Sequence, residues 1–133
     1  PGVWGEVRWK QVRTPPTGYV DLSRLIAGGS DIQGYAATWC ETETEISVVV
    51  HFGCDDTGKI WCNGNLVHES KTERIAVPDE DTFPLVLPPG RSVFLLKIGN
   101  YRGGWGFYFR ITDCKGDEIP SLRWDLPLPL NAT

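Results

Sequence analysis

The sequence predicts an all-β fold, an antiparallel β-sandwich of the jelly-roll type. Most patterned segments alternate apolar and polar residues or are rich in β-branched and aromatic residues, as strands are. Turn residues are dense, with 15 Gly and 10 Pro among 133 residues. Only one short segment carries a helix signal. Many short strands with frequent turns and no alternating helices are typical of a sandwich or barrel.

The chain opens with a short strand expected in residues 18–22, followed by one helical turn in 21–28. Asp21 or Ser23 can cap this turn, and Gly28 with Gly29 can end it. A strand is next expected at 34–40. Its residues Tyr35, Ala37 and Trp39 alternate along one face, and we expect that face to fill the core.

The central strands carry the clearest patterns. In residues 45–53, "EISVVVHFG", one face holds Ile46, Val48, Val50 and Phe52. The strands expected at 58–64 and 65–70 are joined by "NGN", which predicts a tight hairpin because both central residues need a positive φ.

Four more strands complete a total of about nine. They are expected at 73–77, at 83–87, at 91–100 after the turn signal "PPG", and at 105–112. In the last of these, Trp105, Phe107, Phe109 and Ile111 share one face.

The length fits one domain spanning 1–133, with its core in about 18–112. Residues 1–17 and 113–133 include the proline-rich stretches "TPPTG" and "DLPLPLNAT", so we expect straps or linkers there. Trp4, Trp9 and Trp124 lie near the two ends and could pin them to the sandwich.

The charge pattern argues against nucleic acid and anionic membranes as partners. The net charge is −4, the pI is near 5.1, and the thirteen Lys and Arg residues never form a run. No apolar run reaches the roughly 20 residues that span a bilayer, and "PGVWGEVRWK" lacks the apolar core of a signal peptide. We expect a processed protein or a domain cut from a longer one.

Four cysteines, Cys40, Cys54, Cys62 and Cys114, permit two disulfides in three connectivities, or free thiols. Cys54 and Cys62 flank a turn, where a bridge across a hairpin is conceivable. None of the spacings is C-x-x-C, which disfavours a zinc site. The sequence leaves bridged and reduced forms open.

Enzyme motifs are absent, so we expect no catalytic activity. No nucleophile elbow, zinc-protease motif or phosphate-binding loop is present. His51 and His68, the two histidines, are expected on strand surfaces. Asp55 and Asp56 are adjacent, and adjacent side chains of an extended chain diverge to opposite faces, so they cannot flank one substrate bond without a special turn.

No cofactor is expected to be required, although a structural calcium is one reading of "PDEDT". Its Asp79, Glu80 and Asp81 offer oxygen ligands but lack the spacing of an EF-hand loop. A solvated acidic loop is the other reading.

The positive signal is aromatic: six Trp and four Tyr, several of them beside polar residues. In "GNYRGGWGFYFRI", residues 99–111, Tyr101 and Trp105 can stack on a sugar ring while Asn100 and Arg102 bond its hydroxyls. For Trp105 the alternative is a place in the core. Trp61 alternates away from Ile60 and Cys62, and either covers the second side of its sheet or exposes its ring.

The segments "GYVDLSRLI", "GYAATW", "CDDTGKIWCNGNLVHE", "VPDEDTFPLVLPPGRSVFLLKIGN" and "GGWGFYFRI" resemble accessory β-sandwich domains of the galactose-binding-like type. Such domains accompany bacterial glycoside hydrolases and polysaccharide lyases, and the similarity spans about 18–112. The resemblance implies a sugar site in loops at one end of the sandwich, at positions matching Asn100, Tyr101 and Trp105. The chain departs from the pattern at Cys54 and Cys62, which hints at a family-specific disulfide.

These observations predict a non-catalytic, lectin-like carbohydrate-binding module that targets a parent enzyme to a polysaccharide. The expected partners are a polysaccharide or oligosaccharide and a tethered catalytic domain, and the expected location is extracellular or at a bacterial cell surface. Arg102 and Arg110 favour acidic sugars. The alternative is a structural spacer or protein-docking domain. The predicted sugar-binding residues are Asn100, Tyr101, Arg102, Trp105, Trp61 and Asp56.

Overall fold

The computed structural model describes residues 9, 11, 18–25, 31–71, 75–101 and 103–124. Within these residues the elements are β1 (Tyr19–Asp21), α1 (Leu22–Leu25), β2 (Ile32–Thr42), β3 (Ile46–Asp55), β4 (Thr57–Cys62), β5 (Asn65–Ser70), β6 (Asp81–Leu87), β7 (Gly90–Asn100) and β8 (Gly106–Thr112).

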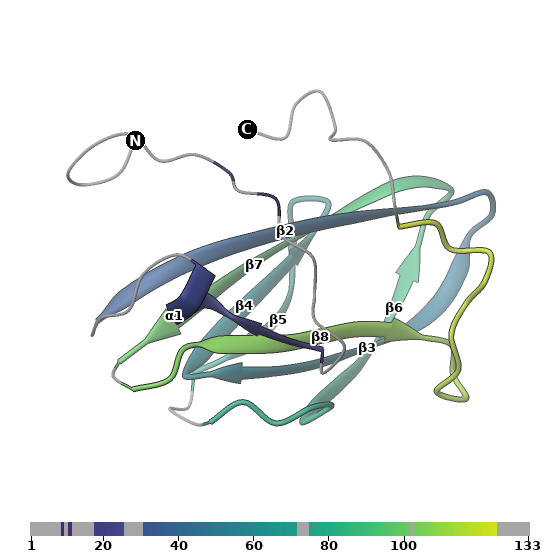
Figure 1. Ribbon diagram of the computed structural model, residues 1–133. Coiled ribbons are helices and arrows are strands. Elements are labelled where there is room, and N and C mark those ends of the chain that lie inside the picture. Colours follow the sequence, from purple (N-terminus) through teal and green to yellow (C-terminus); the bar gives the residue numbers. More distant parts are fainter. Residues whose placement is uncertain are drawn as a thin grey trace.

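The eight strands form two four-stranded sheets, in the orders β1-β8-β3-β6 and β2-β7-β4-β5. Every pairing is antiparallel. Figure 1 shows β8 and β3 side by side along the length of the sandwich. The prediction of an all-β antiparallel sandwich is therefore confirmed, whereas its jelly-roll, galactose-binding-like form stays a prediction.

One hydrophobic core lies between the sheets. Val48, Val50 and Phe52 of β3 are at most 1% exposed, as their alternation predicts. From the other sheet, Phe94 and Ile98 of β7 are fully buried.

The expected inward face of β2 is wrong. Tyr35 is 48% exposed, and the buried residues of β2, namely Gly34, Cys40 and Thr42, all lie on the opposite face. A period of two shows that alternate residues lie on opposite faces of a strand, but it does not show which face is buried. The large side chains of β3 and β7 already fill the space between the sheets, so β2 turns its small residues inward.

Local signals set the helix and the hairpin. Asp21 Oδ1 accepts hydrogen bonds from the Ser23 amide (3.2 Å) and hydroxyl (2.6 Å), which confirms Asp21 as the cap of α1. Gly28 and Gly29, the expected helix end, lie outside the described residues. Asn63 and Gly64 both have a positive φ, at 50° and 86°, as the predicted tight hairpin requires.

The strand expected at 73–77 is wrong for the part that the structure describes, since 75–77 form no strand. This segment instead lies against β3. A Cβ on Gly53 would be only 1.9 Å from the Val77 carbonyl oxygen, so the segment can approach only because residue 53 is glycine.

The segment 113–124 packs against the sandwich. Leu122 is buried, Arg123 pairs with Glu41 of β2 through both backbone and side chain, and the Trp124 ring lies 6.5 Å from Phe94. Trp9 is 51% exposed, whereas Trp4 lies outside the described residues. No helix in the described part of the chain is long and apolar enough to cross a membrane.

All four cysteines are free, with Cys40, Cys54 and Cys62 buried and Cys114 exposed. Of the two alternatives that the sequence left open, the structure has the free thiols, and Cys54 and Cys62 are not bridged. Burial, with a smaller contribution from nearby Cys62, raises the pKa of Cys40 to about 12. Its thiol therefore stays protonated and behaves as a small apolar core group.

Candidate functional site

The outer face of the sheet β2-β7-β4-β5 presents side chains in rows across the strands. The strand registers define three of these rows. The first is polar, with Gln33, Gly99 and Thr57. The second holds Tyr35, Lys97, Lys59 and Glu69, and the third holds Ala37, Leu95, Trp61 and Leu66. Polar and apolar rows therefore lie next to one another on a single face.

A shallow groove of about 330 Å³ opens over the polar end of this face. Its lining comes from all four strands and from the residues that directly follow β5 and β7, namely Gln33, Thr57, Gly58, Lys59, Glu69, Ser70, Lys71, Lys97, Gly99 and Tyr101. Gly99 has no side chain to rise from the floor of the groove. A Cβ at this position would lie only 2.6 Å from Thr57 Oγ1. A second depression of about 180 Å³ adjoins it and shares Gln33, Thr57, Gly99 and Tyr101.

One tyrosine, Tyr101, lines the larger groove, and a second, Tyr35, lies beside it as the strand partner of the lining residue Lys97. Tyr101, at its end, is 48% exposed and belongs to the surface, as the sequence favoured. Tyr35 is exposed to the same extent, and Lys97 Nζ lies 5.9 Å from its ring centroid. Each tyrosine thus keeps about half of its surface exposed.

Asp56 positions Tyr101 instead of facing a ligand. It is 4% exposed, and its Oδ2 accepts the Tyr101 amide hydrogen bond at 2.8 Å. The Tyr101 carbonyl accepts the Asp31 amide at 3.2 Å, so the backbone is held on both sides. The predicted role of Asp56 in bonding sugar hydroxyls is corrected, because the carboxylate is buried beneath the loop.

Asn100 and Trp105 are also structural. Each is 2% exposed. Asn100 Nδ2 lies 3.5 Å from the Gly103 carbonyl, and Trp105 Nε1 donates to the Ile98 carbonyl at 2.9 Å. Trp105 therefore takes the core alternative, and its buried ring offers no face for stacking. Arg102 lies outside the described residues.

Trp61 lies on the outer face, half-buried in the apolar row between Leu95 and Leu66. It thus covers the second side of its sheet while keeping part of its ring exposed. Of the six predicted residues, Tyr101 lines the groove and Trp61 lies one row beyond it.

Asp55 and Asp56 do not diverge as they would in an extended chain, because Asp56 lies in the turn between β3 and β4. A hydrogen bond joins their carboxyl groups, and Asp55 Oδ2 would be 2.9 Å from a Cβ at Gly104. Burial, that hydrogen bond and the charge of Asp56 together raise the pKa of Asp55 to about 6.

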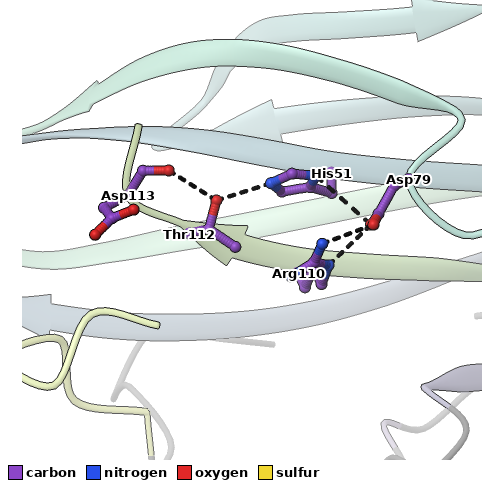
Figure 2. A network of polar contacts seen from close by, with 5 residues as sticks. All are labelled: His51, Asp79, Arg110, Thr112 and Asp113. Carbon is purple, nitrogen blue, oxygen red and sulfur yellow. Dashed lines mark hydrogen bonds and ion pairs between the residues drawn. The ribbon is translucent and has the colours of Figure 1, made fainter. Parts of the chain in front are cut away.

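A polar network occupies the outer face of the other sheet (Figure 2). Arg110 binds Asp79 through Nε (2.8 Å) and Nη2 (2.6 Å). His51 Nδ1 lies 3.5 Å from the same carboxylate, and its Nε2 lies 2.8 Å from Thr112 Oγ1. The Arg110 hydrogen bond is the main cause that lowers the pKa of Asp79.

The order Thr112, His51, Asp79 is that of a nucleophile, base and orienting carboxylate, which the sequence motifs did not reveal. Yet Thr112 is 2% exposed, and its hydroxyl donates to the Asp113 carbonyl at 2.9 Å. A hydroxyl has one proton, so His51 Nε2 must be the donor toward Thr112. Since His51 cannot then accept the Thr112 proton, the network links strands and does not activate a nucleophile.

The acidic loop fits a calcium ion poorly. Asp79 is held by Arg110, and Asp81 Oδ2 lies 2.9 Å from His68 Nε2. His68 also stacks on Phe83 at 4.8 Å, so it is not the strand-surface residue expected from the sequence. Nowhere in the described part of the chain do three His, Cys, Asp or Glu side chains gather as a metal site.

No family model, curated protein or solved structure matches this chain. The resemblance to galactose-binding-like domains stays a prediction, and the features that bear on function are the groove, Tyr101 in its lining and Tyr35 beside it. Sequence reasoning missed Gln33, Tyr35, Lys59, Glu69 and Lys97. Their strands were predicted, but only the registers bring them into adjacent rows.

Proposed function

We propose that this protein is a non-catalytic carbohydrate-binding domain whose site is the groove on the sheet β2-β7-β4-β5. The observation that carries the proposal is the pair of half-exposed rings, Tyr35 and Tyr101, beside a groove of about 330 Å³ lined by polar side chains.

Sugars need this combination of surfaces. Their axial C–H groups pack on the electron-rich face of an aromatic ring, and their hydroxyls bond amide, hydroxyl and charged groups. Gln33, Thr57 and Glu69 supply such groups along the groove. The low floor at Gly99 lets a ring approach the backbone.

The shallow shape favours binding along a chain with modest affinity per site. In a longer secreted protein, tethering would raise the effective concentration of a catalytic neighbour at its polysaccharide. We propose this targeting role, with a location outside the cell or at its surface.

Affinity electrophoresis of the full 133-residue chain through gels containing single polysaccharides tests the proposal. The panel includes neutral glucans, xylan, mannan and galactan as well as acidic polymers. We expect at least one polymer class to retard the protein. Tyr35→Ala and Tyr101→Ala should reduce this retardation while circular dichroism stays unchanged, since both rings are half-exposed and Ala keeps the Tyr101 amide.

The matched control is Tyr108→Ala. Tyr108 belongs to β8 in the other sheet, where its ring lies 5.1 Å from that of Tyr19. Retardation should persist in this variant. If no polymer retards the folded protein, the sugar site is refuted, and the apolar row with Trp61 and exposed Leu66 then favours a protein-docking domain.

A further inference from the structure

The groove carries a surplus of positive charge in a protein whose net charge is −4. Three lysines, Lys59, Lys71 and Lys97, line it with one acidic residue, Glu69. The surplus of two positive charges is local, so the overall acidity does not describe this surface.

Two of these lysines are placed against each other. Lys59 and Lys97 are directly paired across β4 and β7 on the same face. Like charges opposite one another destabilise a sheet. An anion seated between the two ammonium groups would remove that repulsion.

Glu69 does not neutralise the row. Its carboxylate is shared between Lys59, at 3.4 Å, and Lys71, at 3.9 Å. Among the described residues, no carboxylate lies within ion-pair distance of Lys97. The contact given for its ammonium is with the Tyr35 ring, at 5.9 Å from the centroid. Lys97 is thus a cation held beside an exposed aromatic ring.

We propose that the groove selects an anionic sugar residue, one bearing a carboxylate or a sulfate. The acidic group lies between Lys97 and Lys59 while the sugar ring packs on Tyr35 or Tyr101. This inference rests on the proposed sugar-binding function and assigns its ligand class. Arg110, one of the two arginines that favoured acidic sugars in the sequence, has no part in it, because it is bound to Asp79 on the other sheet. The other, Arg102, lies outside the described residues.

The lining of the adjoining depression favours placing the ligand's carboxylate or sulfate in the larger groove. The smaller one is lined by Asp31 beside Gln33 and Tyr101, and a carboxylate there repels an anion. A chain crossing both would place its acidic group over the lysines and neutral hydroxyls near Asp31.

Isothermal titration calorimetry with polygalacturonate and its fully methyl-esterified form tests the ligand class. The two polymers share a backbone and differ in charge. Alginate, chondroitin sulfate and unsulfated chondroitin separate carboxylate from sulfate, and neutral galactan controls for uncharged sugar. We expect an acidic polymer to bind more tightly than its uncharged counterpart, with affinity falling as salt rises.

Lys97→Met removes the charge and keeps most of the stem. We expect about three- to fivefold weaker binding of the acidic polymer, the effect of one ion pair near a surface. The control is Lys115→Met, in the exposed turn that follows β8, which should leave affinity unchanged.

The outcomes separate the two proposals. Equal binding of esterified and free polymers, weakened in Tyr101→Ala, overturns the anionic preference and leaves the sugar site standing. No binding of any polymer overturns both. Displacement of bound polygalacturonate by polyglutamate at equal charge overturns the sugar-specific site in favour of a general anion site.

Discussion

The outer faces of the two sheets contrast in how their charges are compensated. On β1-β8-β3-β6, Asp79 takes two hydrogen bonds from Arg110 and lies beside His51, which in turn bonds Thr112. On β2-β7-β4-β5, Lys59 faces Lys97, and the one acidic group in their row, Glu69, is shared with Lys71.

This contrast shows how a structural network differs from a binding surface. On the first face the described polar groups contact one another, although His51 Nδ1 lies 3.5 Å from Asp79 without making a hydrogen bond. The segment ending at Asp79 lies against Gly53 and covers part of this face. In the second face the cations and the aromatic rings are exposed beside a groove. The count of charged residues alone would not separate the two.

The largest expected effect on stability comes from Gly53→Ala, which displaces the segment around Val77 from the outer face of the sheet β1-β8-β3-β6. The new Cβ would meet the backbone of Val77 at 1.9 Å, and a backbone carbonyl cannot move aside alone. We expect a loss of about 1–3 kcal/mol in the free energy of unfolding, measured with urea. Ser47→Ala, on the same strand and face, is the control and should change it by less than about 0.5 kcal/mol. Equal stability of both variants would contradict the close contact.

The next effect is a pH dependence from Asp55. Its pKa rises from the ordinary value of 3.8 to about 6 on folding, so between these values the folded state binds more protons than the unfolded state. Stability from this group is therefore greatest below about pH 4 and declines as pH rises through 6. Asp55→Asn cannot ionise and can donate to Asp56, so its Tm should exceed that of the parent by a few degrees at pH 7. Thermal unfolding from pH 4 to 8 checks this, and parallel curves for both proteins would refute it.

A smaller effect is expected from Arg110→Met. The ion pair with Asp79 is bidentate, but both side chains are substantially exposed. We expect a loss of about 0.5–1 kcal/mol in urea unfolding and a rise in the pKa of Asp79 toward its ordinary value, read by NMR titration. Polysaccharide binding should stay unchanged, and weaker binding would mean that the two faces are not independent.

The smallest effect on stability is expected from Lys97→Met. Removing the charge relieves repulsion with Lys59 and gives up the contact with the Tyr35 ring, and these contributions oppose each other. The free energy of unfolding should change by less than about 0.5 kcal/mol. The two variants together test whether the faces differ in role. Arg110→Met should lower stability and leave polysaccharide binding unchanged, whereas Lys97→Met should weaken binding and leave stability unchanged. A loss above 1 kcal/mol would make Lys97 structural.

Local patterns were sufficient for much of the fold. The alternation in β3, the paired positive φ values at Asn63 and Gly64, and the Asp21 cap follow from side-chain period and turn chemistry. These features depend on neighbours in the chain, so the sequence predicted them. It also identified Tyr101 as a surface aromatic, since the glycines that follow interrupt the strand pattern.

The site depended on contacts that no local pattern contains. The expectation that Tyr35 lies in the core was wrong, because the alternation of residues defines the two faces of a strand but not which face is buried. The Asp55 and Asp56 carboxyls meet only in the folded turn, where the buried Asp56 fixes Tyr101.

The strand content, the main turns and the antiparallel sandwich follow from the amino-acid sequence, because they depend on short-range sterics and the burial of apolar faces. Which aromatic rings face outward and which charges become neighbours depends instead on tertiary packing. Lys59 and Lys97 lie far apart in the chain, and the β4/β7 register alone makes them adjacent. Such long-range pairings are chosen by how the whole core packs, and they created the charged groove that we propose as the binding site.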